Sequence, residues 1–192
     1  MVPHGFVPWG TRPDLDGPGV YVVTQTKESE SASDGVSLPL ISGERVRELL
    51  DACLELRLDG MPPKPEELVD RLSSFLVPDQ TVLYIGKAGT SVRGRVRDYY
   101  STPLGAQRPH AGGWVLKTLA QLDSLFVYFA SSPDPESSER SMLKAFIAGV
   151  SAGSRQHLHD PSLPLPFANL ELKDAGKRIR KKHGISGATG CG

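Results

Sequence analysis

A glycine and a lysine stand where a short apolar run ends and a helical pattern begins. Residues 81–85 are apolar and rich in β-branched types, and Gly86 and Lys87 follow them directly. Thr90 or Ser91 then occupies the position where a helix needs its N-cap. The stretch therefore predicts a strand, a tight turn and a helix.

Arg95 is the residue of this helix whose position could do chemistry. A spacing of 100° per residue gives the helix one face formed by Val92, Val96 and Tyr99. Arg95 lies beside Tyr99 at the edge of that face, where a guanidinium needs an anionic partner, whereas Arg93 and Arg97 point elsewhere. An arginine held near a backbone glycine and a lysine suits a phosphate group. An ordinary amphipathic helix accounts for the same pattern.

Glu139 is a carboxylate on the apolar side of a second helical pattern. The apolar positions that follow it at helical spacing are Met142, Leu143, Phe146, Ile147 and Val150. A buried carboxylate is costly unless it meets a cation, a metal ion or a hydrogen-bond donor, so we expect such a partner. The alternative is an exposed acid in the first helical turn, stabilised by the helix dipole. Glu136 already fills that role.

Two tyrosines lie on expected strands that are far apart in sequence. Tyr21 belongs to the β-branched run 20–24, Tyr84 to the run 81–85, and residues 124–129 read as a third strand. If the first two strands pair, both tyrosines can point the same way. Buried tyrosines are mostly structural, so spacing alone assigns them no chemistry.

The remaining elements must position these residues. Residues 36–78 read as a helical pair inserted between two strands, in a domain that spans 1–172, and residues 173–192 form a basic tail. Lys+Arg 22 balances Asp+Glu 22, so nucleic-acid binding would depend on local patches. The candidate basic contacts are Arg93, Arg97, Lys177, Arg178, Arg180, Lys181 and Lys182.

Several features that the sequence lacks indicate the cellular compartment. It has no apolar run of about 20 residues and no basic-then-apolar leader, so we expect no membrane association. The two cysteines are far apart and lack metal-ligand spacing, which favours a reducing compartment. A cytoplasmic protein is the expectation.

Taken in order, these motifs resemble the GIY-YIG nuclease superfamily. The matching segments are 19–21, 84–86, Arg95 with Tyr99, 139–140 and 166–169. The resemblance implies an α/β (α+β) fold: a small three-stranded, mainly antiparallel sheet flanked by helices, here with a helical insertion between the first two strands.

The resemblance also implies an active site. Its residues would be Tyr21, Tyr84, Lys87, Arg95, Tyr99, Glu139 and Asn169. Glu139 would bind one Mg²⁺ or Mn²⁺ ion, Arg95 would stabilise developing charge, and Tyr21 would orient or deprotonate water. A tyrosine with an ordinary pKa of about 10 is a poor base at neutral pH, so Lys87 or Arg95 would have to lower that pKa.

The resemblance implies one of two functions of different class. The first is a metal-dependent endonuclease that hydrolyses DNA phosphodiester bonds. The second is a catalytically idle module of the same fold that binds nucleic acid or protein, with the helical insertion and the basic tail as its working surfaces. A metal-activated nicking assay separates the two.

Overall fold

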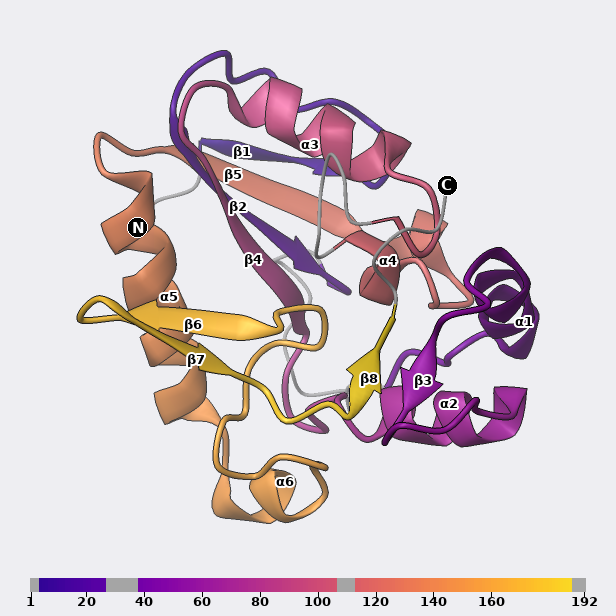
Figure 1. Ribbon diagram of the computed structural model, residues 1–192. Helices are drawn as coiled ribbons and strands as arrows, with labels where there is room; N and C mark the ends of the chain where they lie inside the picture. Colours follow the sequence, from indigo (N-terminus) through magenta and orange to yellow (C-terminus); the bar gives the residue numbers. More distant parts are fainter. Residues whose placement is uncertain (1–3, 27–37, 107–112, 188–192) are drawn as a thin grey trace.

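A four-stranded antiparallel sheet is the centre of the computed structural model, which describes residues 4–26, 38–106 and 113–187. Its strands are β1 (Gly5–Pro8), β2 (Gly19–Thr24), β4 (Val82–Ala88) and β5 (Phe126–Ser131), in the spatial order β1-β5-β2-β4 (Figure 1). The mixed α+β class is confirmed. The expected three strands are the inner strand β2 with its two neighbours, β4 and β5.

The fourth strand, β1, lies in the proline- and glycine-rich segment before β2 and was not among the expected strands. It pairs with β5, and the Phe6 ring stacks on Tyr128 with centroids 5.1 Å apart. Only four residues long, β1 is exposed at every second residue, so its apolar content is too small to stand out beside the surrounding Pro and Gly. The expectation of three strands was therefore one short.

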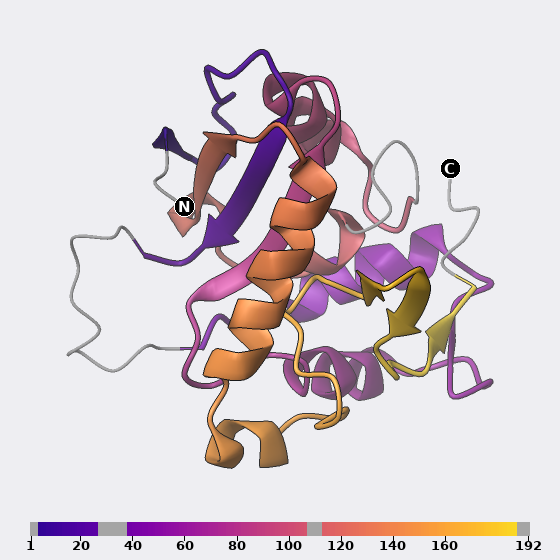
Figure 2. The same ribbon diagram turned by 90° about the vertical axis from the view of Figure 1, so that its left-hand side faces the viewer.

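Two helices, α3 (Val92–Ser101) and α5 (Pro135–Gly149), cover opposite faces of the sheet. α3 packs Val96 and Tyr99 into the same core as Tyr21, while α5 packs Leu143 and Phe146 into a second core with Ile85. Side chains alternate across a strand, so neighbouring residues of β2 and β4 reach the two different cores. Figure 2 shows α5 running across one face of the sheet.

The expected helical insertion is present between β2 and β4. It contains α1 (Gly43–Ala52), the short strand β3 (Arg57–Leu58) and α2 (Pro65–Ser73). Ser42 caps α1 by accepting from the Arg45 amide, and the apolar sides of the two helices join the main core. Three short helical turns complete the described helices: α4 (Gly113–Leu116), the 3₁₀ turn η1 (Leu122–Ser124) and α6 (Ala152–Gln156).

The described part of the basic tail is folded back onto the domain. β6 (Glu171–Asp174) and β7 (Lys177–Arg180) form a hairpin, and β8 (Ile185–Ser186) pairs with β3 of the insertion. Ala175 and Gly176 both have positive φ, as a two-residue hairpin turn requires. The expected boundary at residues 172 and 173 therefore runs through a strand.

Two further expectations bear on the compartment. Within the described residues, no helix is long and apolar enough to cross a membrane. Cys53 is buried in the core and is disulfide-bonded, so the cysteines do not indicate the reducing compartment that their spacing favoured.

Candidate active site

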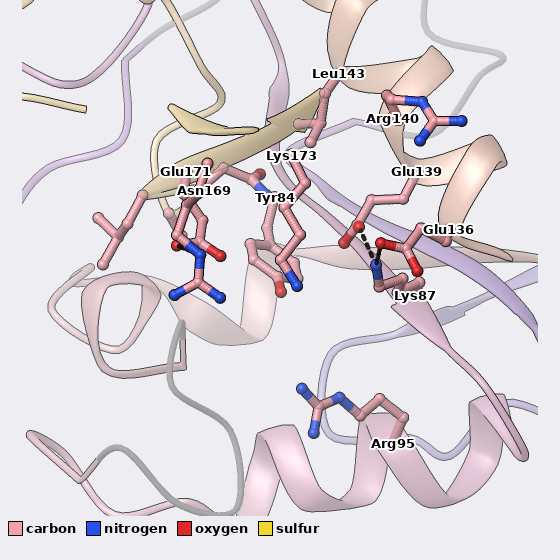
Figure 3. Close-up of a pocket in the computed structure, with 13 residues that line it drawn as sticks. Tyr84, Lys87, Arg95, Glu136, Glu139, Arg140, Leu143, Asn169, Glu171 and Lys173 are labelled. Atoms are coloured by element: carbon pink, nitrogen blue, oxygen red, sulfur yellow. Dashed lines mark ion pairs between the residues drawn. The ribbon is translucent and has the colours of Figure 1, made fainter. Parts of the chain in front are cut away.

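The open edge of β4 carries a cavity of about 410 Å³. In the described sheet, β4 pairs with β2 on one side only, and α3 and α5 approach its other side from opposite faces (Figure 3). Tyr84 reaches the cavity from the α3 face of β4 and Lys87 from the α5 face. The lining residues are Tyr84, Lys87, Arg95, Glu136, Glu139, Arg140, Leu143, Ala168, Asn169, Leu170, Glu171, Lys173 and Arg178.

Three tyrosines lie close together next to this cavity, and Tyr84 is the one that lines it. Ring centroids lie 5.9 Å apart for Tyr21 and Tyr84, 5.1 Å for Tyr84 and Tyr99, and 6.3 Å for Tyr21 and Tyr99. Gly86, the register partner of Tyr21, makes room for them: a Cβ there would lie 2.5 Å from Tyr21 Cζ and 2.6 Å from Tyr84 Cε1. The prediction that Tyr21 and Tyr84 share a face is confirmed, and the glycine is explained by their rings.

The surroundings of Tyr21 and Tyr84 raise their pKa values, further above neutral pH. Burial raises the pKa of Tyr21 well above its ordinary value, and the neighbouring Tyr84 and Tyr99 raise it further, against a smaller lowering by Arg95. Burial and the charge of Glu139 likewise raise the pKa of Tyr84. Tyr21 is 1% exposed and does not line the cavity. Burial thus shifts the pKa of Tyr21 in the direction opposite to the lowering that a base role requires.

Glu139 meets a cation, as its place on the apolar stripe predicts. Its Oε2 lies 3.1 Å from Lys87 Nζ, which is also 3.4 Å from Glu136 Oε1 (Figure 3). The Glu139 side chain is 20% exposed, and burial raises its pKa against the opposing effect of Lys87. Two carboxylates one helical turn apart therefore share one ammonium group.

This donor set limits the kind of metal site that is possible. In the described ranges, no three His, Cys, Asp or Glu side chains lie together as ligands. Mg²⁺ often binds through one or two carboxylates, with water and substrate phosphate completing its shell. Glu139, with Glu136 nearby, fits that mode, and the position of Lys87 shows that both carboxylates favour a cation here.

Of the three arginines on α3, Arg95 reaches the cavity. Arg93 instead pairs with Asp14, and its Nε donates to the Pro13 carbonyl at 3.4 Å, which ties the lead-in to the helix. Arg97 pairs with Asp98 at 3.1 Å and lines a neighbouring groove. This groove shares Lys87, Arg95 and Glu136 with the cavity. The sequence-based separation of Arg95 from its neighbours agrees with these positions.

Asn169 lines the cavity, but its amide is engaged by the backbone of β4. Its Oδ1 accepts from the Ile85 N–H at 2.9 Å, and its Nδ2 donates to the Ile85 carbonyl at 2.8 Å. Ala168 N–H donates to the Leu83 carbonyl next to it. Asn169 and Ala168 therefore fasten this segment to the edge of the sheet beside the cavity.

The basic candidates of the tail divide into three groups. Arg178 lines the cavity, whereas Lys177, Arg180 and Lys182 are exposed outside it. Lys181 is 5% exposed, and its Nζ donates to three successive carbonyls, of Leu165, Pro166 and Phe167. A buried ammonium with these acceptors cannot reach a phosphate backbone, so Lys181 is no longer a candidate for nucleic-acid binding.

Four charged residues of the cavity were not among the sequence candidates: Glu136, Arg140, Glu171 and Lys173. The first two flank Glu139 on one helix, which helical spacing could have shown. Glu171 and Lys173 reach the site only because the hairpin folds back. The Ala175-Gly176 turn was the feature of the sequence that could have predicted this hairpin.

None of the protein-family models matches this chain, and neither a curated protein nor a solved structure is significantly similar to it. The resemblance in motifs therefore remains a prediction from the residues.

Proposed function

We propose that the chain is a metal-dependent endonuclease that hydrolyses DNA phosphodiester bonds at an active site of the GIY-YIG type. One observation carries the proposal. Tyr84, Lys87, Arg95 and Glu139 come from three different elements and converge on one cavity at the edge of β4. These types supply a metal-binding carboxylate, two cations for phosphate charge and a hydroxyl.

Each side chain has a role that follows from its surroundings. A bound Mg²⁺ or Mn²⁺, one per site, would supply Lewis-acid stabilisation of phosphate charge. Glu139 would hold that ion, and Lys87, which pairs with Glu139 in this structure, would bind a phosphate oxygen. Arg95 would bind the charge that develops on the phosphoryl group from the α3 side.

The tyrosines act as hydrogen-bond donors in this proposal. Their raised pKa values keep the hydroxyls of Tyr21 and Tyr84 protonated at neutral pH. Tyr84, which lines the cavity, can donate to a phosphate oxygen or hold the attacking water. Tyr21 and Tyr99 lie behind it and fix its ring, so they are positioning residues.

A second function has its own support. A module that binds nucleic acid without cutting it would need no base, and the raised pKa values of the tyrosines and the engaged amide of Asn169 are consistent with that. The first function requires DNA to be cut in a reaction that depends on metal and on Glu139. The second requires DNA to be bound without being cut.

The deciding experiment is a nicking assay on supercoiled, branched and single-stranded DNA, with and without Mg²⁺ or Mn²⁺. We expect the wild type to cut only with metal and Glu139→Gln to lose cutting. Glu44→Gln is the matched control, because Glu44 is an exposed acid in the first turn of α1, away from the cavity. Equal cutting by Glu139→Gln would refute the assignment. Metal-independent binding without cutting by the wild type would establish the second function.

Thermal unfolding gives a readout that does not depend on cutting. Mg²⁺ bound to the native state should raise the Tm with its concentration, and Glu139→Gln should lose this response while Glu44→Gln keeps it. An identical Mg²⁺ response in all three proteins would place the metal elsewhere.

A further inference from the structure

The β6–β7 hairpin has two chemically different faces. Its register pairs Glu171 with Arg180 and Lys173 with Arg178, so these four side chains share one face. Leu172 points to the other face and is buried in the core between α5 and β4. Leu172 holds its face of the hairpin against the core. The opposite, charged face is therefore directed at the cavity, where Glu171, Lys173 and Arg178 form one wall.

The hairpin is held firmly against the domain. Lys144 of α5 pairs with Asp174 at the start of the turn, with Nζ and Oδ1 2.8 Å apart. At the other end, the Lys181 N–H donates to the Leu170 carbonyl at 2.9 Å, and its buried ammonium binds the carbonyls of the loop before Asn169. The backbone that carries the charged wall is therefore held in place, which lowers the entropic cost of binding a ligand.

The cavity carries more positive than negative charge, and the positive charges lie on separate walls. Five basic and three acidic side chains line it, in a chain whose net charge is zero. Arg95 projects from α3 on one side of Glu139, and Lys173 comes from the hairpin on another (Figure 3). Glu171 pairs with Arg178 at 3.3 Å and orients its guanidinium.

We propose that this charged face of the hairpin is a subsite for the phosphate next to the scissile one, contacted by Lys173 and Arg178. The inference rests on the proposed function and names its substrate class: an internal phosphodiester of a polynucleotide strand, in place of a mononucleotide or a terminal phosphate. Cations on both sides of Glu139 match a chain of regularly spaced phosphates, and such contacts position a strand without reading its sequence. A cavity of about 410 Å³ holds a segment larger than one phosphate.

The test measures binding of fluorescent DNA in EDTA, so that no cutting is needed. Binding of a twelve-nucleotide single strand is titrated at several salt concentrations for the wild type, Arg178→Gln and Lys173→Gln. Arg45→Gln is the matched control: Arg45 is 53% exposed and paired with Glu48, and Arg178 is 51% exposed and paired with Glu171. Thermal unfolding of every variant confirms that it is folded.

Each hairpin variant should weaken binding about fivefold to tenfold and lower the slope of log K against log salt by about 1, whereas Arg45→Gln should change neither. The wild type should also bind the twelve-nucleotide strand more tightly than a dinucleotide, and Arg178→Gln should reduce that preference. Slopes equal to the wild type in both folded hairpin variants, or no DNA binding by the wild type, would overturn the subsite.

Failure of the subsite and failure of the proposed function give different results. Metal-dependent cutting with unchanged salt slopes removes the subsite and leaves the nuclease. Changed slopes without any cutting leave a polynucleotide-binding face on a protein that is not a nuclease.

Discussion

Lys181 offers a quantitative check on how the site is held together. It is 5% exposed, its Nζ lies 3.1 Å from the Pro166 carbonyl and 3.3 Å from that of Phe167, and the ring of Phe75 is below it at 5.3 Å. Burial lowers the pKa of this lysine to about 7, against an opposing effect of the Asp160 carboxylate. The substitution that tests this pKa shift is Lys181→Met, which keeps the length of the side chain and removes its charge.

The sign follows from proton binding. The ordinary pKa of lysine is 10.5, so between about pH 7 and 10.5 the unfolded chain binds more protons at this residue than the native chain does. The free energy of unfolding then rises with pH, by at most about 1.4 kcal/mol per pH unit for one proton, or about 3 kcal/mol from pH 7.5 to 9.5. Below pH 7 both states are protonated, and Lys181 contributes no pH dependence.

Urea unfolding at pH 7.5, 8.5 and 9.5 measures this contribution as the difference in pH dependence between the wild type and Lys181→Met. Other groups that titrate in this range, such as Lys117, whose pKa burial lowers to about 8, remain in both proteins and cancel. Lys182→Met is the control, because its side chain is exposed next to Lys181. Parallel pH dependences in the wild type and Lys181→Met would refute the reasoning.

Two further substitutions test the elements that shape the cavity. Gly86→Ala places a methyl group against the rings of Tyr21 and Tyr84, so we expect a loss of roughly 1–3 kcal/mol in urea unfolding, and a cost near zero would mean that the rings move easily. Asn169→Ala leaves the buried Ile85 N–H and C=O without this partner, which should cost about 1–3 kcal/mol and speed amide exchange at Ile85. Unchanged exchange there would show that the amide does not fasten this edge.

The sequence predicted those parts of the site that depend on local pattern. Ser91 caps α3 as expected, with its side chain accepting from the Gly94 amide, and helical spacing placed Arg95 apart from Arg93 and Arg97. The expected partner for Glu139 is there in Lys87. These predictions succeed because capping and periodicity act within a few residues.

The features that the sequence did not predict depend on contacts between distant segments. A basic run is usually solvated, so nothing local marked Lys181 as buried. It is buried because the chain returns past the loop at 165–167. The engagement of Asn169 with Ile85 spans 84 residues. The pKa direction of Tyr21 likewise depends on burial by α3 and β4, which residue type does not reveal.

The attachment of Asn169 to β4 has a consequence for the order in which the chain is made. All four strands of the sheet have left the ribosome once Ser131 has emerged, but the residue that covers the edge at Ile85 follows 38 positions later, at 169. Domains fold during synthesis from the N-terminal side, so a nascent chain would pass through a stage with an uncovered β4. Exposed strand edges pair with other chains. A messenger that ends before codon 169 would therefore yield a product prone to self-association, and chaperone demand should fall once the final segment emerges.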